Sequence, residues 1–320
     1  MFQISGGLLR RLLMGRSVEL FNKKWNTDFP EPETLGRQQV KKSAFGFLGG
    51  YNKALEFGFS PLLISELDGY NRNLRGFAYE GAGMGLAMID YTALGKRSRL
   101  QEFLERPAAQ YPELIHVGAG FSIALLHKNI HKTLSQMPPF YRWWAIDGFA
   151  FCRGIFEWKK CVIHQVTYGL DGYFLRAFDR GLGRWFWFMH DADVMRIVDQ
   201  LQNFPDSRHA DLWSGIGLAC TYAGGVNQKQ IEFLKESAKS HVSYLALGSA
   251  LAAKCRLTAD NIVEHNDLAC SILCNMSTEE VGQLTLHIAK EIKIDPDESV
   301  LVEQPIFETW REAIRSQLTR

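Results

Sequence analysis

Apolar and small side chains dominate the stretch from Arg75 to Tyr91, which is too long for one strand and predicts a buried helix. Its middle contains three glycines at alternate positions, Gly81, Gly83 and Gly85. A glycine inside a helix costs about 1 kcal/mol relative to alanine, so we expect another backbone or a ligand to approach this face closely. Glu80 is the one charge in the middle of the stretch. A carboxylate beside apolar surface needs a partner or takes up a proton, which makes Glu80 the first candidate for chemistry.

Two later stretches, residues 141–156 and 211–225, repeat this pattern and predict further helices. In each of them an acid, Asp147 or Asp211, leads a glycine-bearing apolar run, as Glu80 does. The three acids stand 67 and 64 residues apart, which is a weak indication of an internal repeat. They form the first group of candidate acids or bases.

Residues 114–123 resemble the strand and glycine loop of a dinucleotide-binding motif. Ile123, however, stands where a third small residue should let helix and strand approach, and no alternating βαβ pattern surrounds the segment. We therefore predict another helix rich in small residues, and no nucleotide cofactor.

The whole pattern predicts an all-α fold of about a dozen helices. One possible arrangement of these helices is an αα-barrel, a two-layer toroid around an apolar cavity. Residues 1–30 are expected to form an amino-terminal helix and linker, residues 31–295 the main helical domain, and residues 296–320 a linker and a carboxy-terminal helix packed on it. Further helices are predicted at about 37–57, 173–190, 228–239, 242–255, 259–273 and 278–292, with Gly224-Gly225 as a helix end.

Composition narrows the function classes. Lys+Arg 36 against Asp+Glu 35 gives a net charge of +1, which provides no general reason to expect nucleic acid. No uninterrupted apolar run reaches the roughly 18 residues of a membrane-spanning helix. The amino-terminal leucines opposite Arg10 and Arg11 leave peripheral membrane contact open, although a packed helix is the more ordinary interpretation.

Cysteine and histidine spacing gives no metal site. The six cysteines lack the paired spacing of a zinc site or a disulfide framework, so reduced thiols and a cytoplasmic location are expected. His127 and His131 have helical metal-pair spacing, but no further ligands follow. We expect neither metal nor cofactor.

Asp191 and Asp193 form the second group of candidate acids, directly after the aromatic run that contains Trp185 and Trp187. Two adjacent carboxylates repel, so one of them keeps its proton near neutral pH, and a shielded neutral acid beside aromatic faces can protonate an alkene. The alternative is that these acids cap a helix, where the dipole would stabilise the anion and oppose such acidity.

Substrate binding is assigned to aromatic residues of the apolar runs and to an arginine stripe. The stripe could hold a substrate carboxylate or phosphate, but structural pairing with Asp179 or Asp147 is the alternative. The candidates are Tyr79, Trp143, Trp144, Phe149, Trp185, Trp187, Trp213, Tyr222, Arg176, Arg180 and Arg184.

Five blocks, residues 75–84, 116–120, 147–151, 176–185 and 211–225, together resemble a bacterial family of unknown function often labelled enediyne biosynthesis proteins. The resemblance implies a bacterial protein of specialised metabolism that acts on or near a long apolar polyene-like compound. A weaker likeness concerns architecture. Acid-led inner helices resemble the helical barrels of class II terpene cyclases, whose Asp-x-Asp-Asp motif is half met by Asp191-Ala192-Asp193-Val194.

Two functions are carried forward. The first is a cofactor-independent biosynthetic enzyme that cyclises or isomerises a long polyene or isoprenoid-like substrate by acid-base chemistry, beginning with protonation. The second is a non-catalytic accessory or carrier protein for such a compound or its synthase. The sequence leaves the substrate, the product and the oligomeric state open.

Overall fold

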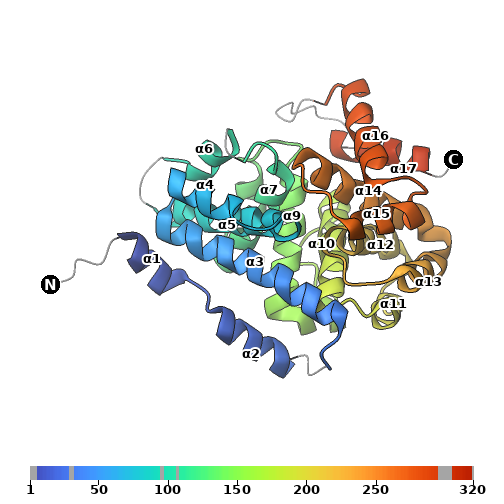
Figure 1. The fold of residues 1–320 in the computed structure, drawn as a ribbon, viewed down its shortest axis with the longest axis horizontal. Helices are drawn as coiled ribbons and strands as arrows, with labels where there is room; N and C mark the ends of the chain where they lie inside the picture. Colours follow the sequence, from blue (N-terminus) through green and yellow to red (C-terminus); the bar gives the residue numbers. More distant parts are fainter. Residues whose placement is uncertain (1–5, 29–31, 94–96, 106–107, 295–304, 319–320) are drawn as a thin grey trace.

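The computed structural model describes residues 6–28, 32–93, 97–105, 108–294 and 305–318, and every regular element in these ranges is a helix (Figure 1). The all-α prediction is confirmed, with more helices than the dozen expected. They are α1 (Gly6–Met14), α2 (Val18–Asp28), α3 (Leu35–Phe57), α4 (Pro61–Asp68), α5 (Arg72–Thr92), α6 (Arg99–Glu105), α7 (Pro112–Leu125), α8 (Ile130–Leu134), α9 (Arg142–Trp158), α10 (Gly172–Met189), α11 (Val194–Gln202), α12 (Asp206–Ala223), α13 (Gln228–Ala238), α14 (Val242–Thr258), α15 (Glu264–Leu273), α16 (Thr278–Glu291) and α17 (Ile306–Leu318).

The long helices pack in chain order. Each of α3, α5, α7, α9, α10, α12, α14 and α16 lies against the next one in this series, and the shorter α11, α13 and α15 pack along one another beside it. Contacts between successive helical units are typical of solenoid proteins, in which each unit buries its apolar face against its neighbours. The two-layer barrel and the division into domains stay predictions.

Glycines set the spacing of this stack. Gly148, Gly181, Gly215 and Gly248 follow one another at intervals of 33 or 34 residues, and each lies on a different long helix. A methyl group added at any of them would overlap a backbone carbonyl of the preceding long helix. Close backbone approach therefore offsets the cost of helical glycine, as expected for Gly81, whose own added methyl would overlap Phe47. The 67-residue spacing from Glu80 to Asp147 matches two such units, and the 64-residue spacing from Asp147 to Asp211 is a few residues shorter than two units.

Side chains join distant members of the series. Lys254 of α14 forms an ion pair with Glu113 of α7, and the Arg256 guanidinium donates to the Asn73 carbonyl near the start of α5 at 3.3 Å. At the other end, Gln39 of α3 donates to the Ala223 carbonyl at the end of α12 at 3.0 Å. The series therefore curves back on itself, and early helices contact late ones.

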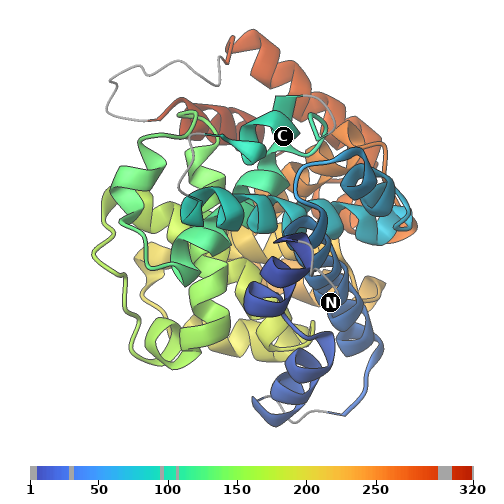
Figure 2. The same ribbon diagram turned by 90° about the vertical axis from the view of Figure 1, so that its left-hand side faces the viewer.

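Most predicted helix positions agree with the structure, including the helical assignment of residues 114–123 within α7 and the end of α12 at Gly224, whose φ of 69° favours glycine. Two predictions differ from the structure. The amino-terminal segment forms two helices, α1 and α2, which lie on the outside of the stack (Figure 2). The helix predicted from Ala259 begins at Glu264, because Asp260 has a positive φ of 45° that ends α14 first. Among the described helices, none has the length and apolar character needed to cross a membrane.

Candidate functional site

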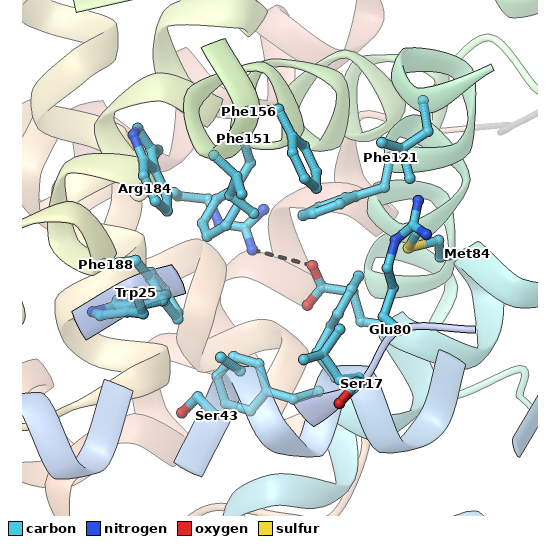
Figure 3. Close-up of a pocket in the computed structure, with 18 of the residues that line it drawn as sticks. Ser17, Trp25, Ser43, Glu80, Met84, Phe121, Phe151, Phe156, Arg184 and Phe188 are labelled. Carbon is cyan, nitrogen blue, oxygen red and sulfur yellow. Dashed lines mark ion pairs between the residues drawn. The ribbon is translucent and has the colours of Figure 1, made fainter. Parts of the chain in front are cut away.

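A pocket of about 310 Å³ lies between the α1–α2 segment and helices α3, α5, α7, α9 and α10. We call it the Glu80 pocket, because Glu80 supplies a carboxylate to walls that are mainly aromatic and aliphatic (Figure 3). Its lining is Gly15, Arg16, Ser17, Leu20, Trp25, Ser43, Ala44, Phe47, Leu48, Phe77, Glu80, Met84, Phe121, Leu125, Phe151, Ile155, Phe156, Arg184, Trp185 and Phe188. A concave apolar site with a few converging polar groups is the usual form of a ligand site.

Glu80 lies in the middle of α5 and is only 3% exposed. Its carboxylate faces Arg184 of α10, with 3.5 Å between Glu80 Oε1 and Arg184 Nη2 (Figure 3). The pKa of Glu80 is raised to about 7, with burial as the largest cause; the Arg184 cation opposes this rise and the nearby Asp147 adds to it. Near neutral pH the group is therefore present in both protonation states.

Asp147 bonds to Arg184 and links it to a second arginine, Arg180. Asp147 is fully buried, and its two oxygens accept from different guanidinium groups: Oδ1 from Arg184 and Oδ2 from Arg180 Nε at 3.0 Å. Arg180 also donates to the Trp143 carbonyl at 2.9 Å. Two arginines thus share two acids, and the group is neutral when Glu80 is ionised. The predicted alternative of structural pairing with Asp147 is what the structure shows for both Arg180 and Arg184.

Asp191 and Asp193 have different surroundings and different partners. Asp191 is buried, accepts from Trp25 Nε1 at 3.1 Å and forms an ion pair with Arg37; burial raises its pKa, whereas Arg37 and Trp25 lower it. Asp193 is half exposed and caps α11, accepting from the Met195 amide at 3.0 Å. The capping alternative therefore describes Asp193, and neither acid lines the Glu80 pocket.

Asp211 belongs to a separate buried network between α10, α12 and α17. Arg176 Nε donates to it at 2.8 Å and Arg311 Nη2 at 3.1 Å, while Arg176 also contacts Glu308. All of its charges are paired within the network, which joins the carboxy-terminal helix to the stack. Asp179, the other partner considered for the arginine stripe, instead pairs with Arg208.

Of the predicted aromatic residues, Trp185 alone lines the Glu80 pocket. The others are buried elsewhere in the core. For example, Tyr79 stacks on Tyr111 and donates to Asp68 at 2.7 Å, and Trp187 donates to the Gly224 carbonyl at 3.0 Å. The remaining members of that set are Trp143, Trp144, Phe149, Trp213 and Tyr222.

Sequence reasoning missed most of the pocket wall. Its aromatic members outside the predicted set are Trp25, Phe47, Phe77, Phe121, Phe151, Phe156 and Phe188. One signal was available: Phe151 follows Asp147 by one helical turn and so shares its face of α9. The others come one each from α2, α3, α5, α7, α9 and α10, which only the tertiary fold brings together.

The described residues hold no group of three or more His, Cys, Asp or Glu side chains that could bind a metal ion. All six cysteines are free and buried, and burial raises the pKa of Cys152 and Cys220, which keeps these thiols protonated and unreactive.

Comparison with known proteins identifies a family whose function is unknown. The family model described as "Protein of unknown function (DUF1702)" matches residues 6–318, nearly the whole chain. Searches of curated proteins and of solved structures found no match to this chain. The site itself is therefore the basis for inferring a function.

Proposed function

We propose that this chain, which belongs to the DUF1702 family, is a biosynthetic enzyme. It binds the apolar part of an unsaturated small molecule in the Glu80 pocket and isomerises that molecule by moving a proton with Glu80. The observation that carries this proposal is the buried Glu80 carboxyl group, which faces an apolar pocket with its pKa raised to about 7. A group that titrates near the working pH can act both as a base and as an acid.

The raised pKa favours proton transfer to and from carbon over the initial protonation of an isolated alkene. A higher pKa makes Glu80 a stronger base and a weaker acid, whereas alkene protonation needs a strong acid. In the proposed step, the Glu80 carboxylate takes a proton from an allylic carbon, and the electrons of that C–H bond shift along the conjugated double bonds. The protonated Glu80 then returns the proton to another carbon, so that no oxidant or cofactor is required. Arg184, 3.5 Å from Glu80, would stabilise the negative charge that develops.

The size of the pocket limits which part of a long substrate can enter. A volume of about 310 Å³ is at the lower end of the roughly 300–1,000 Å³ typical of ligand sites. One unsaturated segment would lie against Glu80, and the rest of a long chain would extend past Leu20 and Phe156, which line the pocket and are also exposed. The bacterial, cytoplasmic setting in natural-product metabolism, and a kinship with enediyne-associated proteins, form part of this proposal.

A non-catalytic carrier is the second candidate, and the ion-pair network favours it. Arg184 contacts both Asp147 and Glu80, so Glu80 could serve only to neutralise a buried cation beneath a storage pocket. Both functions predict ligand binding, but only the enzyme exchanges protons with the ligand.

Deuterium exchange separates the two candidates. The protein is incubated in D₂O with a conjugated polyenoic fatty acid, whose binding is followed by its fluorescence and whose deuterium content is followed by mass spectrometry. We expect the wild type to introduce deuterium, Glu80→Gln to do so at least about 100-fold more slowly, and the control Asp193→Asn to match the wild type. Equal binding by all three proteins without exchange would identify a carrier for this probe. Loss of exchange in Asp193→Asn, with Glu80→Gln unaffected, would place the chemistry elsewhere.

A further inference from the structure

Helix α1 packs on the protein with its polar side and turns its leucines outward. Gly7 lies so close to α3 that an added methyl would overlap the Glu56 carbonyl. Arg10 Nε donates to the Leu55 carbonyl at 3.0 Å, and Arg11 forms an ion pair with Glu56. An ordinary surface helix does the opposite, burying its apolar stripe and presenting its charges to water.

The leucines of α1 are exposed in two successive turns of the helix. Leu8 and Leu9 are 39% and 48% exposed, and Leu12 and Leu13, one turn further on, are 65% and 74% exposed. Leu20 on α2 is also exposed, at 67%. We call Leu8, Leu9, Leu12, Leu13 and Leu20 the leucine strip.

The leucine strip is held rigidly and adjoins the mouth of the Glu80 pocket. The linker between α1 and α2 is fixed on α3 by Asn52, which donates to the Arg16 carbonyl at 2.8 Å and accepts from the Arg16 amide at 2.9 Å. Arg16, Leu20 and Phe156 line the pocket and are exposed at the same time. Figure 2 shows α1 and α2, in dark blue, on the outer face of the helix stack.

We propose that the leucine strip docks the protein on an anionic lipid bilayer, with the mouth of the Glu80 pocket facing the membrane. Exposed leucines that would enter the acyl boundary, together with the exposed cations Arg16 and Lys23 of the same amino-terminal segment, are typical of an interfacial amphipathic surface. A second copy of the chain would bury the leucines equally well, and the test below separates it from the bilayer. The inference rests on the proposed function in one respect: a substrate dissolved in the bilayer could pass from the lipid into the pocket.

Vesicle flotation tests this surface without any substrate. The probes are vesicles of phosphatidylcholine alone and of phosphatidylcholine with phosphatidylglycerol, at low and high salt. The wild type is expected to bind the anionic vesicles, less so at high salt, and the pure phosphatidylcholine vesicles weakly. The variant Leu12→Ser/Leu13→Ser should bind at least about tenfold more weakly, because it removes two apolar side chains that would enter the bilayer.

The matched control is Leu35→Ser/Leu62→Ser, which removes two leucines that are 82% and 51% exposed and lie outside the leucine strip. This control, like Glu80→Gln, should bind vesicles as the wild type does, so membrane docking and catalysis fail or succeed independently. The proposal is overturned if the wild type does not float with anionic vesicles, or if both double variants lose binding equally. It is also overturned if analytical ultracentrifugation finds a dimer that Leu12→Ser/Leu13→Ser disperses, since the strip would then be a contact between copies.

Discussion

Replacing Glu80 by glutamine should remove a large part of the pH dependence of stability. Glutamine has nearly the same shape and keeps a carbonyl oxygen for Arg184, 3.5 Å away, but it cannot ionise. The substitution therefore isolates the free energy of ionising one buried carboxyl group, with little change in packing. Any difference between the two proteins that varies with pH reports on the proton of Glu80.

The sign follows from the direction of the pKa shift. Folding raises the pKa of Glu80 from 4.5 to about 7, so the native state binds the proton more tightly than the unfolded chain. The stabilisation is complete below the unfolded pKa and is lost as pH rises through the folded pKa. A shift of that size, at about 1.4 kcal/mol per pKa unit, corresponds to roughly 3 kcal/mol, of which roughly 2–3 kcal/mol falls between pH 5 and pH 8.

The assay is urea unfolding of the wild type and Glu80→Gln at pH 5 and pH 8, followed by tryptophan fluorescence. Burial also raises the pKa of Asp179, to about 6, which adds a stability loss of the same sign to both proteins and cancels in their difference. We expect the wild type to lose roughly 2–3 kcal/mol more than Glu80→Gln between these two pH values. Identical pH profiles, within about 0.5 kcal/mol, would refute the reasoning and show that Glu80 does not titrate near neutrality in the folded protein.

Three further substitutions test the stack, the cap and the pocket. Gly215→Ala should lower the free energy of unfolding by about 1–3 kcal/mol in thermal or urea unfolding, because its methyl group would overlap the Arg180 carbonyl. The control Gly46→Ala, whose added methyl group has its nearest contact at 3.5 Å, should raise it by up to about 1 kcal/mol. Equal effects of the two substitutions would contradict the glycine spacing argument. Asp193→Ala should cost about 1 kcal/mol through loss of the α11 cap, with ligand binding unchanged. Ala44→Phe, at a partly buried position in the pocket lining, should weaken binding of the fluorescent polyenoic acid at least about tenfold while circular dichroism stays native; undiminished binding would place the ligand elsewhere.

Local pattern was enough to predict the helices and to single out Glu80. Small residues without charge over a long stretch can only be accommodated inside, and a lone acid among them must be buried with a partner. The spacing of 67 and 64 residues between the three acids was visible, but its unit of 33 or 34 residues was not, because Gly148, Gly181, Gly215 and Gly248 are recognised as equivalent only when their contacts are known.

Which side chains meet depends on contacts between distant parts of the chain, and these are not encoded in local spacing. Asp191 and Asp193 are two residues apart, yet positive φ values of 53° at Asp191 and 62° at Ala192 turn the chain between them, so one acid is buried against Arg37 and the other caps α11. Trp25 reaches the pocket from the amino-terminal segment and bonds to Asp191 across 166 positions of sequence. No periodicity predicts a contact of that kind.

The charge balance around Glu80 explains why its pKa lies near 7. Arg180, Arg184 and Asp147 carry a net positive charge, so the buried group becomes neutral only when Glu80 ionises. Desolvation favours the protonated acid and the Arg184 cation favours the anion, and these opposing effects leave Glu80 able to gain or lose a proton in the middle range of pH. An anionic group of a ligand placed beside Arg184 would take over the role of balancing that charge. We therefore expect such a ligand to raise the pKa of Glu80 as it binds, which makes the Glu80 carboxylate a stronger base toward the allylic carbon.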